Sequence, residues 1–141
     1  MTRLDDATVL AVLAALTPAM RVYDGDVPDS NADTKVISAT LPYLVFYAMT
    51  DAPATGDSLA GTSGAYLTEF QLTGVGDSRE QAKFILERAK AALDRTRVVF
   101  PSGSRFVRRT DDNQWVRRDD TWTRPGGKPL FFGVDRYAAA I

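Results

Sequence analysis

The sequence predicts a single α+β domain over residues 1–141, in which a mostly antiparallel sheet carries two main helices packed on one face. Three observations lead to this prediction. Apolar residues recur at helical spacing in two segments, apolar runs with strand character lie between and after them, and the 141-residue chain is 45% hydrophobic and 25% charged. A chain of this length and composition buries one core of ordinary size, so a second domain is not expected.

The first helix is expected over residues 5–17. Four apolar side chains fall at helical spacing on one face: Val9, Val12, Leu13 and Leu16. Asp5 and Asp6 suit the first turn of a helix, and Pro18 lies just past its end. Val22 and Tyr23 then predict a short strand, which Gly25 and the turn residues after it break.

Two longer strands follow in the first half of the chain. The segment "LPYLVFYAM", residues 41–49, is continuously apolar, which predicts a central strand covered on both faces. The segment "AYLTEFQLTGV", residues 65–75, alternates between apolar and polar side chains and predicts a half-solvated strand or one that borders a partner. The small and polar residues 50–64 between them have no periodicity, so we expect a mobile or a binding loop.

The second helix is expected over residues 78–94. Its apolar stripe consists of Ala82, Ile85, Leu86, Ala89 and Leu93. Phe84 lies outside this stripe, and an isolated phenylalanine of this kind is more often peripheral core than interface. We keep Phe84 as a candidate interface residue.

A glycine-containing turn, "GVGDSREQ", precedes this helix and invites comparison with loops that bind phosphate. Gly74 and Gly76 are present, but the rest of a dinucleotide or P-loop pattern is missing. The turn reads instead as one of two overlapping capping boxes, Asp77 with Glu80 or Ser78 with Gln81. Since a capping side chain occupies the N–H groups that a phosphate would use, we expect a structural turn.

The last third of the chain predicts a hairpin and a final strand. Phe106–Val107 and Trp115–Val116 flank the turn-forming residues 110–113, and the final strand is expected over residues 130–140. Trp115 and Trp122 suit stacking on bases, but packing across the strands of the hairpin is the favoured interpretation.

The composition excludes several common kinds of enzyme active site. The chain has no histidine and no cysteine, so imidazole and thiolate ligands, cysteine nucleophiles and triads with a histidine base are excluded. Four aspartates in an early loop, Asp24, Asp26, Asp29 and Asp33, lack the pattern of a calcium loop. The N-terminus lacks the plan of a signal peptide, and no apolar run is long enough for a bilayer. We expect a soluble protein that is not an enzyme and has no metal or cofactor.

Paired charges in the last third provide the candidate interface. Arg108 and Arg109 precede two aspartates, and Arg117 and Arg118 directly precede Asp119 and Asp120. Because neighbouring carboxylates compete for the arginines, and the formal net charge is −1, these pairs are a poor footprint for nucleic acid. We interpret the cluster, together with Trp115, as a surface for protein contacts.

The chain as a whole resembles the tail terminator proteins of long-tailed phages that infect actinobacteria. The resemblance rests on the order and spacing of the segments "VYDGDVPD", "LPYLVFYAMTDAP", "EFQLTGVGDSREQAKFILERAKAAL", "VRRDDTW" and "PLFFGVDRYAAAI". It covers nearly the whole chain, except the loop after Met49 and the region of Trp115, where the pattern departs from the family.

The resemblance implies a structural virion protein that forms a hexameric ring, caps the head-proximal end of the tail tube and stops its growth. The implied partners are further copies of the chain, the tail tube protein and a neck or head-completion (stopper) protein. Genomic DNA would pass through the lumen without sequence-specific binding, and no membrane is involved. The implied location is the tail–neck region of the virion, after synthesis in the bacterial cytoplasm. Two alternatives stay open: another neck or head–tail connector protein, and a nucleic-acid-binding module.

Overall fold

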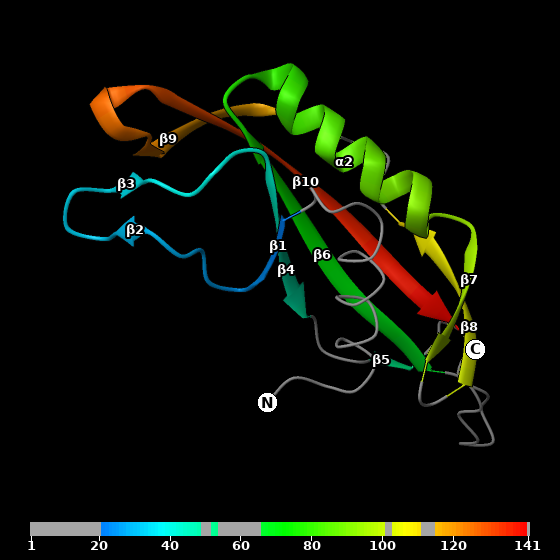
Figure 1. The fold of residues 1–141 in the computed structure, drawn as a ribbon. Coiled ribbons are helices and arrows are strands. Elements are labelled where there is room, and N and C mark those ends of the chain that lie inside the picture. Colours follow the sequence, from blue (N-terminus) through cyan, green and yellow to red (C-terminus); the bar gives the residue numbers. More distant parts are fainter. Residues whose placement is uncertain (1–20, 49–51, 54–65, 101–102, 111–114, 141) are drawn as a thin grey trace.

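One sheet of ten strands and one α-helix make up the described part of the chain. The structure is a computed structural model, and it describes residues 21–48, 52–53, 66–100, 103–110 and 115–140 (Figure 1). Its strands are β1 (Arg21–Asp24), β2 (Ser30–Asn31), β3 (Val36–Ile37), β4 (Tyr43–Ala48), β5 (Ala52–Pro53), β6 (Tyr66–Gly76), β7 (Thr96–Phe100), β8 (Gly103–Arg109), β9 (Arg117–Thr123) and β10 (Pro129–Ala140). The helix α2 (Arg79–Leu93) follows β6, and a 3-10 turn, η1 (Pro125–Gly127), joins β9 to β10.

The long strands β6 and β10 form the antiparallel centre of the sheet. On one side the order continues through β4 to β1, and β5 pairs with the first residues of β6. On the other side, β10 pairs with two strands in succession: β9 lies against its beginning and β8 against its end. The small strands β3 and β2 extend the sheet beyond β9, and β7 extends it beyond β8. The sheet therefore ends in β2 beyond β9 and in β7 beyond β8, and Figure 1 shows these two ends on opposite sides of the molecule.

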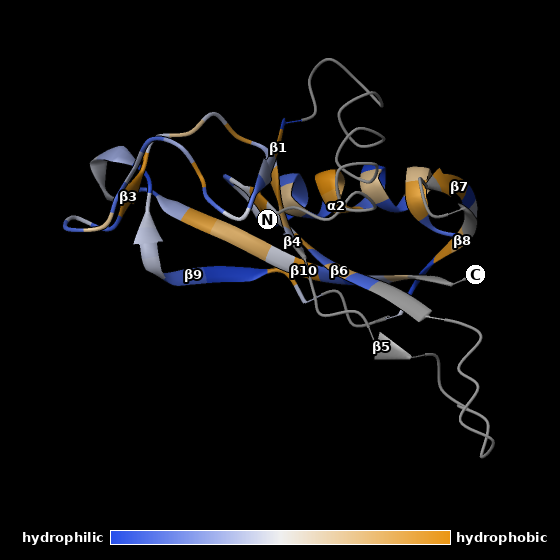
Figure 2. Ribbon diagram, turned by 90° about the horizontal axis from the view of Figure 1, so that it is seen from below, coloured by the Kyte–Doolittle hydropathy of each residue, from blue (hydrophilic) through white to orange (hydrophobic). Residues whose placement is uncertain are grey.

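The predicted fold class, α+β with two main helices packed on one face, is wrong: the structure is mostly β. Within the described ranges a curled sheet carries α2 as its only α-helix, and the predicted helix over residues 5–17 lies outside those ranges. Strands also form where no helix or strand was predicted. β7 follows α2 directly, and β9 forms from the charged segment "RRDDTWT". Exposed charged side chains are compatible with a strand near the edge of a sheet, and Figure 2 shows how hydrophilic β9 is.

The helix covers one face of the sheet and builds the larger core. The buried residues of α2 are those of the predicted stripe: Ala82, Ile85, Leu86, Ala89 and Leu93. They pack with Leu44 and Phe46 of β4, Phe70 and Leu72 of β6, and Tyr137 of β10. Phe70 stacks between Phe46 and Tyr137, with both ring-centroid distances at 5.4 Å. This prediction of the second helix is confirmed.

The opposite face carries a smaller core, and β4 contributes to both. Alternate residues of β4 point to opposite faces, so Leu44 and Phe46 join the helix side, while Tyr43 and Val45 join a cluster with Val75 and Leu130. The side chains of these four residues are at most 3% exposed. The prediction of a central strand covered on both faces is therefore confirmed, as is the short strand at Val22–Tyr23.

The predicted hairpin around residues 110–113 is wrong, although most of the turn itself lies outside the described residues. β8 and β9 do not pair with each other, because each occupies a different stretch of β10: Tyr137–Ala140 for β8 and Pro129–Phe132 for β9. β8 forms its hairpin with β7, and β9 forms one with β10 through η1. The final strand was predicted correctly, with β10 one residue longer at its start.

Candidate functional site

The connection from β1 to β4 determines the shape of the open sheet face. β1 and β4 are adjacent and parallel, so the chain must cross over before it returns. Residues 25–42, here called the arm, make this crossover and form the β2–β3 hairpin on the way. Their tip is a turn in which the Asn31 Oδ1 atom accepts hydrogen bonds from the Asp33 and Thr34 N–H groups. The arm lies beside the open face of the sheet.

The far part of the arm is attached to β9. Val36 pairs with Thr123, and the Thr123 N–H group donates to the Lys35 carbonyl at 3.0 Å. The Lys35 ammonium group lies 5.1 Å from the centroid of the Trp122 ring, a cation–π contact. These contacts attach the far part of the arm to β9.

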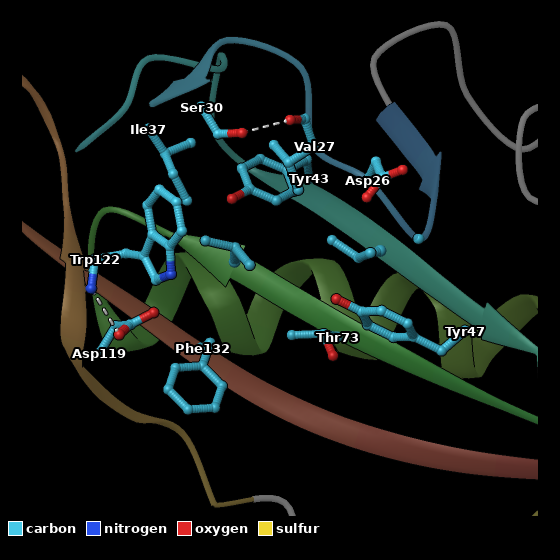
Figure 3. Close-up of a pocket in the computed structure, with 13 residues that line it drawn as sticks. Asp26, Val27, Ser30, Ile37, Tyr43, Tyr47, Thr73, Asp119, Trp122 and Phe132 are labelled. Atoms are coloured by element: carbon cyan, nitrogen blue, oxygen red, sulfur yellow. Dashed lines mark hydrogen bonds between the residues drawn. The ribbon is translucent and has the colours of Figure 1, made fainter. Parts of the chain in front are cut away.

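A concavity of about 310 Å3 lies between the arm and the sheet (Figure 3). Ile37 and Trp122 form one end, and Tyr47 and Thr73 form the other. Its remaining lining residues are Gly25, Asp26, Val27, Ser30, Tyr43, Val45, Val75, Asp119 and Phe132. Tyr47 is 42% exposed at the mouth. The concavity thus combines an aromatic floor with two carboxylates at its walls.

The polar groups of the concavity include an oriented carboxylate and a buried phenol. The Asp119 Oδ1 atom accepts from the N–H groups of Thr121 and Trp122, so this carboxylate is oriented by its own turn. Burial raises the pKa of the Tyr43 hydroxyl, and the neighbouring Tyr23 raises it further. The phenol therefore stays neutral and offers a hydrogen bond instead of a charge. Apolar and cationic side chains of a partner are the groups that such a surface accommodates.

A second surface lies at the other end of the sheet, on the β7–β8 hairpin. Strand alternation directs Val98, Val107 and Arg109 toward the core. The alternate residues Arg97, Val99, Phe106 and Arg108 point outward, and together with the exposed Arg95 of the preceding turn we call them the basic face. Val99 is 76% exposed and Phe106 36%. A polar cleft of about 380 Å3 borders this face at the end of α2.

The structure separates the two members of the first predicted arginine pair. Arg108 is exposed, whereas the Arg109 side chain is 11% exposed and lies 3.9 Å from the fully buried Asp135 carboxylate. The Arg109 N–H group also donates to the Asp94 Oδ1 atom at the end of α2. Arg109 therefore belongs to the interior, and only Arg108 of this pair is available as an interface residue.

The second pair lies on β9, distant from the first along β10. Arg117 and Arg118 are exposed, and the Arg117 guanidinium lies 5.2 Å from the centroid of the Phe132 ring. Asp119 lines the concavity, while Asp120 is exposed. Arg109 pairs with Tyr137 and Arg117 with Phe132, which places the pairs about 17 Å apart along the strand. The two arginine pairs do not form one surface.

The two candidate aromatic residues are both exposed. Trp115 is 76% exposed, and it does not pack against Trp122, which lies in the smaller core. Phe84 is 53% exposed on the outer side of α2, where the Arg88 guanidinium lies 5.5 Å from its ring centroid. The interpretation of Phe84 as peripheral core is wrong, and both residues remain candidates for contacts with a partner.

The glycine turn is capped, by the second of the two predicted boxes. The Ser78 Oγ atom accepts from the Gln81 N–H group at 3.1 Å, and the Gln81 Oε1 atom accepts from the Asp77 N–H group at 2.6 Å. A Cβ atom at Gly76 would lie 2.6 Å from the Ala82 backbone nitrogen. The glycine therefore serves the close approach of β6 and α2.

The strand over residues 65–75 and the loop over residues 50–64 were also expected to take part in binding. The strand predicted over residues 65–75 cannot add a neighbour along its edges, because β6 already pairs with β4, β5 and β10. Most of the loop over residues 50–64 lies outside the described residues, and its Ala52–Pro53 part forms β5.

Sequence reasoning missed Asp135 and the concavity. Asp135 is the single acidic residue in the otherwise mostly apolar strand "PLFFGVDRYAAA", which is a usable signal for a buried ion pair. The concavity has no comparable signal, since its residues come from four separate strands and the arm. Neither a group of three or more acidic side chains placed to hold a metal ion nor a helix long and apolar enough to cross a membrane is found in the described ranges.

Comparison with solved structures shows a likeness in fold. A chain from the virion of a native gene transfer agent (GTA) particle has a similar fold, with a TM-score of 0.57 and 17% sequence identity. The superposition covers 95% of this chain and 92% of that one. No family model and no curated protein matches the sequence. At this identity the likeness shows a shared fold over nearly the whole length of both chains.

Proposed function

We propose that this chain is a structural protein of a phage-like virion, and that it closes the head-proximal end of the tail tube as a ring. The observation that carries the proposal is the fold shared, at nearly full length, with a chain of a virion particle. The ordered segments that resemble tail terminator proteins support it independently, because they were identified from sequence alone.

The surfaces of the chain are compatible with an assembly role. A ring of identical subunits needs two different contact surfaces on each subunit, one for each neighbour, and a further surface for what the ring caps. The basic face and the concavity are two such surfaces at different ends of the sheet, while α2 exposes Phe84 on a third side. Binding of this kind uses exposed aromatic and charged side chains and needs no catalytic group.

The proposal is tested on assembled tails from a particle that lacks the gene. We expect tubes of uncontrolled length that fail to join heads, and recovery of normal particles when the gene is supplied in trans. Electron microscopy of negatively stained particles gives both readouts. Tubes of normal length that fail to join heads would instead favour a neck or stopper protein, and particles that assemble normally would refute both assignments.

A further inference from the structure

The charges of the chain are divided between the two ends of the sheet. The arm, residues 25–42, carries three aspartates and one lysine, a formal charge of −2. Residues 90–109, from the end of α2 through β8, carry five arginines, one lysine and one aspartate, a formal charge of +5. Figures 1 and 2 show β3 of the arm on one side of the molecule and β7 and β8 on the opposite side. Exposed charge is therefore unevenly distributed: the arm is acidic and the β7–β8 end is basic, while β9 beside the arm carries Arg117 and Arg118 next to Asp119 and Asp120.

The two ends also match in their apolar groups. The basic face presents the exposed side chains of Val99 and Phe106 beside its arginines. The concavity presents an aromatic floor beside the carboxylates of Asp26 and Asp119. Exposed arginines beside apolar side chains on one surface complement carboxylates beside aromatic rings on the other.

We propose that the basic face of one copy of this chain docks on the arm and concavity of the next copy. The ends lie too far apart to meet within one molecule, so the contact joins different molecules in the same head-to-tail orientation each time. Contacts of this heterologous type generate a closed ring when the rotation between neighbours closes. The inference rests on the proposed function, because it supplies the subunit contact of the proposed ring.

Charge reversal at either end tests the contact. The acidic-end variant carries Asp26→Lys and Asp33→Lys, and the basic-end variant carries Arg97→Glu and Arg108→Glu; all four side chains are exposed. Each variant alone places like charges at every contact, so we expect self-association at low salt to fall by more than about tenfold. In an equimolar mixture, alternating copies place opposite charges at every contact, and we expect association to recover.

Matched controls carry the same charge changes on the outer side of α2. These are Glu80→Lys with Glu87→Lys, and Lys83→Glu with Arg88→Glu, all at exposed positions. We expect both controls to associate as the wild type does, and circular dichroism to show that every variant is folded. Analytical ultracentrifugation over a range of protein and salt concentrations measures the association.

Three results would overturn the inference. They are a wild type that stays monomeric at low salt at its highest soluble concentration, end variants that associate normally, and a mixture that does not recover. These outcomes leave the proposed function open, because that function is judged from tail length and head joining. Conversely, a recovered mixture together with normal particles in the absence of the gene would refute the tail role and keep the contact.

Discussion

Gly74 on β6 and Gly133 on β10 lie directly opposite each other in the sheet, and the side chain of Leu86 packs on both. A Cβ atom at Gly74 would lie 2.6 Å from the Leu86 Cγ atom, and one at Gly133 would lie 2.9 Å from its Cδ1 atom. This paired gap in the side-chain layer lets α2 approach the centre of the sheet. The position of the helix therefore depends on two residues from distant parts of the sequence.

Replacing Gly74 by Ala should destabilise the protein by about 1–3 kcal/mol, because the added methyl group overlaps Leu86 in a close-packed core. The Leu86→Ala variant, which loses about 2–5 kcal/mol by itself, leaves room for that methyl group. We therefore expect the Gly74→Ala change to cost less in the Leu86→Ala background. Urea unfolding of the four proteins measures the difference, and an equal cost in both backgrounds would contradict the packing argument.

The Ser78→Ala variant should lose about 1 kcal/mol of stability, because the Gln81 N–H group loses its acceptor at the start of α2. Ser78→Asp should retain most of it, since aspartate is also a good capping residue. Thermal unfolding compares the two variants with the wild type.

The same turn should not bind nucleotides. Because capping side chains occupy the N–H groups of Asp77 and Gln81, calorimetric titration with nucleotides should give no saturable signal. A saturable isotherm at micromolar nucleotide that disappears in the Gly76→Val variant would restore the phosphate-loop interpretation.

Arg108 and Arg109 should respond in opposite ways to replacement by Ala. Loss of Arg109 leaves the Asp135 carboxylate buried without this cation, so we expect a destabilisation of about 3 kcal/mol. Loss of the exposed Arg108 should change the stability by less than about 0.5 kcal/mol and act on association instead. Chemical denaturation and ultracentrifugation of both variants separate these effects. Equal losses of stability would show that the neighbouring positions are not distinguished by burial.

Alkaline pH should destabilise the protein through two buried tyrosines. Burial raises the pKa of Tyr43 and Tyr137, and the Asp135 carboxylate raises that of Tyr137 further. A tyrosine whose pKa is higher in the folded state contributes stability that is fully present below its unfolded pKa, about 10. This contribution is lost as the pH rises through the higher folded pKa, because only the unfolded chain ionises readily.

Unfolding measured between neutral pH and pH values above about 10 should therefore show a falling stability, with these tyrosines ionising only as the chain unfolds. The Tyr137→Phe variant is the control, since the Tyr137 hydroxyl group that it removes has no hydrogen-bond partner within the described structure. We expect this variant to lose less stability at alkaline pH than the wild type. A tyrosinate absorbance that reaches its full value while the chain is still folded would contradict the prediction.

The sequence by itself determined the elements whose patterns are local. The continuous apolar run of β4 and the stripe of α2 each lie in one short segment, and both were predicted with their buried faces. The Ser78–Gln81 cap was one of two local alternatives, and the final strand was predicted within one residue. In each case neighbouring side chains decide the structure.

Only the tertiary structure decided which strands meet and which charges are exposed. β8 and β9 share β10 because each pairs with a different stretch of it, whereas their closeness in sequence had suggested a hairpin. That pairing turns Arg108 outward and Arg109 toward Asp135, a distinction invisible in a run of two arginines. The concavity likewise exists only after the arm crosses the sheet. Contacts between distant segments depend on strand register and crossover geometry, which no local periodicity encodes.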